Sequence, residues 1–314
     1  MKRYIAKRLL QLIPILLGIT FLSFALMHVA GGDAISAVLE NQGVAVSQEL
    51  IDQKRAELGL DQPLLIQYGS WLLGLVTGDM GTSYVSGKEV FATFASKLPA
   101  TILLTVCAVA LTIVVSVPLG IYSAVKKNTA ADYIVRVTSF IGNSLPNFFV
   151  ALFLILIFAI GLGWFPVMSS PRDPLGIVLP TVTLGIAMAA KYTRQIRAIV
   201  LEELGKDYVQ GARARGVSER RILFGPVLRN CMLMLITLLA LSIGDLLGGT
   251  AIVETIFMWD GVGKLAVDAI IMRDYPLIQA YVVWMAVIYV VVNLIADLLY
   301  HALDPRVRLE GDRR

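Results

Sequence analysis

The residues Gly261-Val-Gly263-Lys264 have the spacing closest to a nucleotide-binding motif. A phosphate-binding loop also needs a glycine five positions before its Gly-Lys pair and a Ser or Thr directly after it. The backbone N–H groups then hold the phosphates, and the hydroxyl binds Mg²⁺. Met258 and Leu265 occupy those two positions here. The chain is therefore predicted not to hydrolyse ATP and to carry no cofactor of its own.

Other catalytic and metal-binding patterns are also missing from the sequence. It contains no H-E-x-x-H and no G-x-S-x-G, the arrangements that hold a catalytic zinc ion and a nucleophilic serine. Its two cysteines, Cys107 and Cys231, do not make a disulfide framework or a four-ligand zinc site. We therefore expect a non-catalytic protein without a metal site.

Asp245 is a carboxylate within a long apolar stretch. It lies 16 residues past Arg229, which is about 24 Å along a helix. Ionisable residues in such a setting usually face a bundle interior or a water-filled cavity. Two roles remain open: Asp245 meets a cationic substrate on a translocation pathway, or it is a structural hydrogen-bond or ion-pair partner.

The segment 191–229 contains the densest group of basic residues. A helix-forming stretch from Asp207 reaches Arg215, and Gly216 then permits a sharp stop. Gly216 is expected to adopt a positive φ, and Ser218 can cap a second short helix. This pattern predicts a rigid helix–turn–helix, and the alternative is a solvated basic loop.

The composition places these elements in a membrane protein. Hydrophobic residues make up 57% of the chain and charged residues 16%, with a mean hydropathy of +0.75. In soluble domains, about 45–50% of the residues are apolar and about 25% are charged. A helix needs about 20 apolar residues to cross a bilayer. Six runs are candidates, and they predict an all-α polytopic membrane protein with six transmembrane helices: 9–30, 100–125, 134–162, 175–190, 227–253 and 277–303.

The lysines and arginines predict the orientation of these helices. Of the 27, 20 lie in the first eight residues, in 126–136, in 191–229 and in the tail after residue 303. Cytoplasmic segments carry the excess of basic residues, so both termini are predicted to be cytoplasmic. The net charge of +4 is then a topology signal and does not indicate nucleic acid.

The predicted organisation has four parts. Residues 1–30 form the cytoplasmic N-terminus and first helix, and 31–98 form an extracytoplasmic, cap-like insertion with a helix that begins after Ser47. Residues 99–303 form the transmembrane core, which includes the cytoplasmic loop 191–229. Residues 304–314 form a cytoplasmic tail.

The chain resembles, from end to end, the dipeptide/oligopeptide/nickel permease family of ABC importers. The stretches that carry the resemblance are KRYIAKRLLQLIPILLGITFLSF, LGLDQPLLIQYGSWL, GDMGTSY, LPATILLT, SLPNFFVAL, GTAIVETIF, GVGKLAVDAI, RDYPLIQA and ALDPRVR. The 191–229 segment is similar to the family's coupling loop, which reads E-A-A, three residues, then G. Ala212 and Gly216 match that pattern, whereas Gln210 and Gly211 depart from it.

The resemblance implies a set of partners that composition does not show. They are a sister permease subunit, two ABC ATPase subunits that bind ATP and Mg²⁺, an extracytoplasmic substrate-binding protein and membrane lipid. It also implies a bacterial or archaeal cytoplasmic (inner) membrane. The residues expected to couple to the ATPase are Tyr208, Gln210, Gly211, Ala212, Arg213, Arg215 and Gly216. Arg213 and Arg215 are expected to meet acidic groups of the ATPase, or lipid phosphate.

The substrate follows less directly from the resemblance. Gly248-Gly249-Thr250, with Asp245 before it, looks closer to the nickel branch of the family. The favoured substrate is therefore nickel, free or in a small chelate, and the alternative is a dipeptide or oligopeptide. An ion channel or secondary transporter is the alternative from another class. It would need dense intramembrane charge or inverted repeats, and the sequence shows neither.

Overall fold

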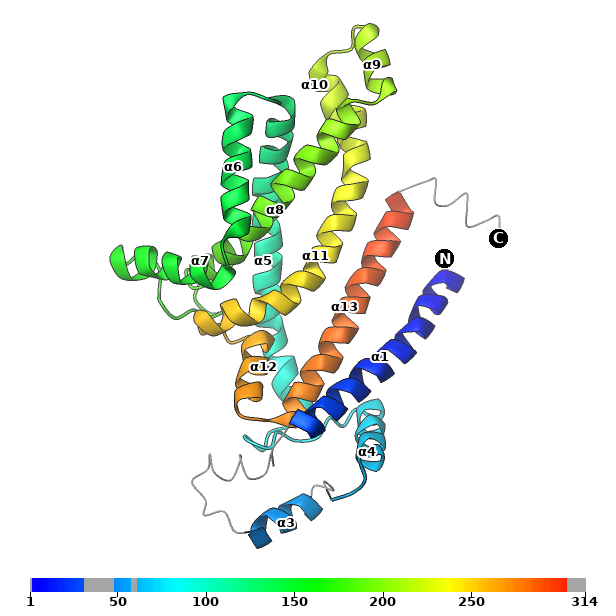
Figure 1. Ribbon diagram of the computed structural model, residues 1–314, viewed down its shortest axis with the longest axis vertical. Coiled ribbons are helices and arrows are strands. Elements are labelled where there is room, and N and C mark those ends of the chain that lie inside the picture. Colours follow the sequence, from blue (N-terminus) through cyan, green and yellow to red (C-terminus); the bar gives the residue numbers. More distant parts are fainter. Residues whose placement is uncertain (1, 31–47, 58–60, 304–314) are drawn as a thin grey trace. The chain divides into compact units, whose positions relative to one another are not determined.

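The computed structural model describes residues 2–30, 48–57 and 61–303, and the regular elements in that part are helices (Figure 1). The one β pairing among the described residues is an isolated bridge between Thr82 and Glu89. The chain divides into two compact units, residues 1–101 with 260–290 and residues 102–259 with 291–314. The helices α5 (Val90–Val125) and α13 (Tyr275–Leu303) each run from one unit into the other. The predicted all-α class is confirmed.

The first unit contains α1 (Lys2–Ala30), α3 (Gln48–Glu57), α4 (Leu64–Thr77) and α12 (Val262–Ile271). Aromatic packing joins α1 to α4, because the Tyr68 ring lies edge-on to Phe21 and Phe24 at centroid distances of 5.3 and 5.6 Å. The hydroxyls of Thr20 and Tyr68 are 3.0 Å apart. Helix α3 occupies the predicted surface helix, while its expected cap, Ser47, lies outside the described residues.

A second cluster in this unit surrounds the start of α13. The buried carboxylate of Asp274 accepts hydrogen bonds from the Ser83 hydroxyl, at 2.5 Å, and from the Tyr84 N–H, at 3.2 Å. Buried apolar side chains pack beside it from α5, α12 and α13: Val90, Ala269, Leu277 and Ala280. The loop before α5 is thereby held against the α12–α13 junction.

The second unit is organised around α8 (Val178–Leu204), which packs against α6 (Ala130–Ser144), α7 (Asn147–Leu154) and α11 (Leu228–Ile256). Its buried residues recur along the helix, and they include Thr183, Tyr192, Ile196 and Val200. Adjacent residues such as Tyr192 and Thr193 are also buried, so more than one face of the helix packs against neighbours. Helix α8 is therefore the common partner of the elements in this unit.

The predicted span 134–162 is not a continuous helix. It consists of α6 and α7, with a π-helical segment at Ile155–Gly161 after them, and the axis bends by 99° at the break between Ser144 and Asn147. Leu145 has an extended backbone, with ψ 130°. A proline clashes with a helical residue before it, so Pro146 ends α6 and begins α7.

The predicted fourth span, 175–190, also has a different end. Helix α8 does not stop near Lys191 but continues to Leu204, so residues 191–204 of the predicted cytoplasmic loop belong to this long helix. By length and apolar composition, two described helices suffice to cross a membrane, Val90–Val125 and Tyr275–Ile295. The bent pair α6–α7 makes a third if it is one span. The number six stays a prediction.

Candidate functional site

Two short helices form the predicted helix–turn–helix, α9 (Asp207–Ala214) and α10 (Glu219–Ile222) (Figure 1). Gly216 has φ +76°, as predicted. The Gly216 N–H donates to the Arg213 carbonyl at 2.9 Å, and the Val217 N–H donates to the Ala212 carbonyl at 3.1 Å. These two bonds make a Schellman motif, which satisfies the last carbonyls of α9 and needs a left-handed residue at the position of Gly216. Residues 207–222 are called the coupling element below.

The coupling element packs on the neighbouring long helices through three buried side chains. Val209 is fully buried, and Ala212 and Ile222 are nearly so. They belong to one apolar cluster with Ile196 and Val200 of α8, with Val227 directly before α11 and with Cys231 in the first turn of α11. The coupling element is therefore packed directly against both long helices.

Glu203, near the end of α8, is the centre of a polar junction between the coupling element and the long helices. Its carboxylate accepts hydrogen bonds from the Tyr208 hydroxyl at 2.8 Å, the Asn230 side-chain amide at 2.7 Å and the Lys206 ammonium at 2.5 Å. Tyr208 belongs to α9 and Asn230 to α11. One carboxylate, 8% exposed, therefore joins three helices.

The hydrogen bonds of this junction shift the pKa values of Glu203 and Tyr208 in opposite directions. Burial opposes ionisation of Glu203, but the hydrogen bonds from Lys206, Asn230 and Tyr208 outweigh it and hold the pKa of Glu203 below its usual value. Burial and the hydrogen bond to the Glu203 carboxylate raise the pKa of Tyr208 to about 12. At neutral pH, Glu203 is therefore ionised and Tyr208 is a protonated donor.

The structure separates the predicted coupling residues into two groups. Tyr208 and Ala212 face the long helices, whereas Gln210, Arg215 and Gly216 are exposed. Arg213 forms a two-bond ion pair with Glu219 across the turn, at 2.6 and 3.1 Å, so its charge is compensated inside the element. A Cβ on Gly211 would lie 3.5 Å from the Arg215 guanidinium. Gln210 and Arg215 are therefore the side chains best placed to meet a partner.

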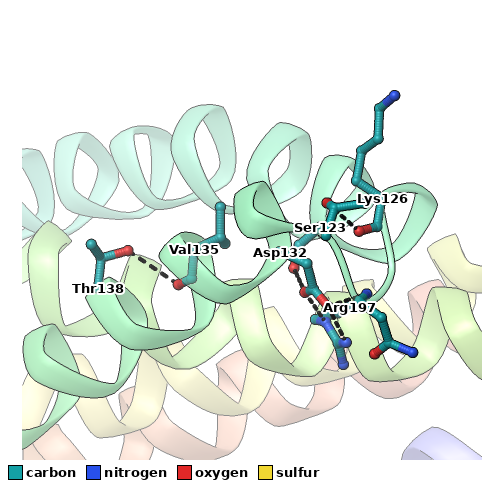
Figure 2. Close-up of polar contacts among 8 residues, drawn as sticks. Ser123, Lys126, Asp132, Val135, Thr138 and Arg197 are labelled. Atoms are coloured by element: carbon teal, nitrogen blue, oxygen red, sulfur yellow. Dashed lines mark hydrogen bonds and ion pairs between the residues drawn. The ribbon is translucent and has the colours of Figure 1, made fainter.

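A second polar junction lies where α5, α6 and α8 meet (Figure 2). The Asp132 carboxylate accepts bonds from Nε and Nη2 of Arg197, at 2.7 and 2.8 Å, from the Ser123 hydroxyl, at 2.5 Å, and from the Asn128 N–H, at 3.0 Å. Asp132 is fully buried, and the Arg197 side chain is 18% exposed. This junction attaches the α5–α6 turn to α8, the helix that leads to the coupling element.

The sequence analysis did not single out six side chains of these junctions: Ser123, Asp132, Arg197, Glu203, Lys206 and Asn230. One local signal existed, the i, i+3 spacing of Glu203 and Lys206, but it also fits an exposed ion pair. Asp245 lies in α11, and its side chain lies outside the described residues. Both of its possible roles therefore remain open.

Comparison with known proteins identifies the family. Residues 116–309 match the family model described as binding-protein-dependent transport system inner membrane component, and residues 1–105 match the N-terminal model of the same systems. A methionine ABC transporter, MetNI, solved in inward-facing conformations, has a TM-score of 0.59 at 16% identity, covering 68% of this chain and 97% of that chain. That likeness shows the fold alone.

Curated relatives match over the full length. The oligopeptide transport system permease protein AppB of Bacillus subtilis (strain 168) is 41% identical over 317 residues, covering 98% of this chain and 99% of the relative. The glutathione transport system permease protein GsiC of Pectobacterium atrosepticum is 38% identical, with the same two coverages. The dipeptide transport system permease protein DppB of Alkalihalophilus pseudofirmus is 35% identical, covering 98% of this chain and all of the relative. The chain thus belongs to the family of inner-membrane permease components of binding-protein-dependent ABC transport systems.

Proposed function

We propose that this chain is the permease subunit of an ATP-driven importer of short peptides. A substrate-binding protein delivers the peptide, and separate ATPase subunits drive alternating access of the permease. The observation that carries the proposal is the coupling element. It is closed by a Schellman motif at Gly216 and joined through Glu203 to both α8 and α11. A rigid element with this attachment suits transfer of an ATPase movement to the membrane helices.

The substrate class rests on the relatives. Their names specify oligopeptide, glutathione and dipeptide transport, and none of these three names nickel. This favours the peptide alternative over the nickel interpretation drawn from Gly248-Gly249-Thr250 and Asp245. ATP hydrolysis is assigned to partner subunits because Met258 and Leu265 occupy the positions that a phosphate-binding loop needs.

The proposed topology has six spans with both termini in the cytoplasm, in a bacterial or archaeal inner membrane. Its support is the unequal distribution of 20 of the 27 basic residues. Ser70, which is exposed on α4, then lies outside. Thiol labelling of a Ser70→Cys variant from the external side is expected, and labelling from the cytoplasmic side alone would contradict the topology.

The experiment that tests the function measures uptake by the assembled complex in proteoliposomes. We expect ATP-dependent uptake of a labelled dipeptide or tripeptide and no uptake of nickel ions. In Gly216→Ala, the forced left-handed conformation costs about 1–2 kcal/mol, so we expect roughly tenfold slower peptide uptake. Peptide-independent nickel uptake by the parent complex would contradict the substrate class.

The choice of substitute at Gly216 separates backbone strain from side-chain bulk. A Cβ at this position has no heavy atom within 4 Å, so Gly216→Ala should act through backbone strain and not through a clash. Asparagine tolerates the left-handed region better than other residues do, so Gly216→Asn should retain most of the uptake. Equal uptake by the parent, alanine and asparagine forms would show that this turn is not needed for coupling.

A further inference from the structure

One cavity of the second unit belongs to neither the coupling element nor the Glu203 junction. It has a volume of about 420 Å³ and is lined by residues 133–140 of α6 and residues 194–197 of α8, the part of α8 that approaches the coupling element. Its lining combines three arginines with aromatic and aliphatic side chains: Tyr133, Arg136, Val137, Phe140, Arg194 and Arg197. The lining of the cavity is therefore partly basic and partly apolar.

Two of the three arginines have no ion-pair partner in the part of the chain that the structure describes. Arg197 is neutralised by the Asp132 carboxylate (Figure 2). Arg136 and Arg194 are exposed, and no carboxylate among the described residues forms an ion pair with either. The Arg136 guanidinium lies 5.3 Å from the centre of the Tyr133 ring. Stacking of this kind orients a guanidinium while its edge N–H groups point outward to an acceptor.

The apolar residues of the lining lie on α6. Val137 follows Arg136 directly, and Phe140 lies one helical turn further on, so Arg136 and Phe140 share a face. Val137 and Phe140 are 55% and 64% exposed. A basic group at one end of a helix face with exposed apolar side chains beyond it matches the order of a phospholipid, headgroup first and acyl chain next.

We propose that this cavity binds a phospholipid with an anionic headgroup. Arg136 and Arg194 hold the phosphate, and the first part of an acyl chain lies on Val137 and Phe140. The charge complementarity accounts for a preference over zwitterionic lipid, and the apolar face accounts for a preference over free phosphate.

The test uses the purified complex and counts retained lipid by native mass spectrometry after exposure to equal amounts of phosphatidylglycerol and phosphatidylcholine. The parent complex should retain phosphatidylglycerol preferentially. In the double variant R136Q/R194Q, the ratio of retained phosphatidylglycerol to phosphatidylcholine should fall about 25-fold. Each basic residue near an anionic surface contributes roughly fivefold to this ratio. The matched control is K126Q/K127Q, which removes two positive charges from the α5–α6 turn but not from the cavity, and it should behave like the parent.

Three results would overturn the proposal. The first is an equal loss in K126Q/K127Q, which would indicate a general surface attraction without a site. The second is displacement of phosphatidylglycerol by millimolar inorganic phosphate, which would show a free-anion site. The third is loss of the sister permease from R136Q/R194Q on co-purification, which would make this face a subunit interface.

Phe140→Ser should weaken retention of both lipids and leave the anionic preference intact.

Discussion

Replacing Asp132 by asparagine is expected to lower the free energy of unfolding by about 3 kcal/mol, the lower end of the cost of breaking a buried ion pair. The lower end applies because the Arg197 side chain is 18% exposed, and water offsets part of its lost partner. An asparagine oxygen can still accept bonds at one side. Its amide NH2, however, faces an N–H of Arg197 in either orientation, Nε at one side or Nη2 at the other, so two donors oppose each other.

The matched comparison is the double variant D132N/R197M, which removes the unpaired charge as well. Replacing both partners of a buried pair costs much less than removing one, so the double variant should recover part of the lost thermal stability. The measurement is the thermal midpoint of the purified complex in detergent, with Arg136→Gln as a nearby arginine control. Equal losses in the single and double variants would show that Asp132 and Arg197 do not act as a pair.

Glu203→Ala is expected to weaken the attachment of the coupling element by about 2–3 kcal/mol, since hydrogen bonds to a buried charge contribute about 1.5–3 kcal/mol. The Tyr208 hydroxyl and the Asn230 amide both lose their acceptor. Lys206 is half exposed and can turn to water, so it adds little. We expect ATP hydrolysis by the complex to continue while peptide uptake falls about tenfold or more.

Two further variants distinguish the junction from a general charge effect. Glu202→Ala removes the same charge from the neighbouring, exposed position and should leave uptake unchanged. Tyr208→Phe removes one donor and should have an intermediate effect. If Glu203→Ala reduces uptake and ATP hydrolysis in proportion, the ATPase has been lost from the complex, and the junction holds the subunits together rather than transmitting movement.

The effect of Glu203→Ala should not change between about pH 6 and pH 9. The pKa of Glu203 is depressed in the folded state, so its stabilising contribution is present above its ordinary pKa of 4.5 and is lost as the pH falls further. The pKa of Tyr208 is raised to about 12, so its contribution is complete below its ordinary value of 10 and is lost toward 12. Both contributions are therefore at full strength across this window.

The sequence determined those properties that depend on a few adjacent residues. Long apolar runs identify membrane helices because transfer into lipid is decided segment by segment. The stop at Gly216 and its positive φ were predictable because a Schellman motif is closed by residues within one turn. The family was recognisable because its motifs are contiguous stretches of sequence.

The tertiary structure decided which charged residues are structural. Asp132 and Arg197 are 65 residues apart, and Glu203 and Asn230 are 27 apart. Each looks like one more charged or polar residue of a basic cytoplasmic segment until the packing of α8 brings the partners together. The tertiary structure also decided the 99° bend at Pro146 and the continuation of α8 to Leu204. A proline permits several backbone outcomes and a charged helix end permits several partners, and burial against neighbouring helices selects one of them.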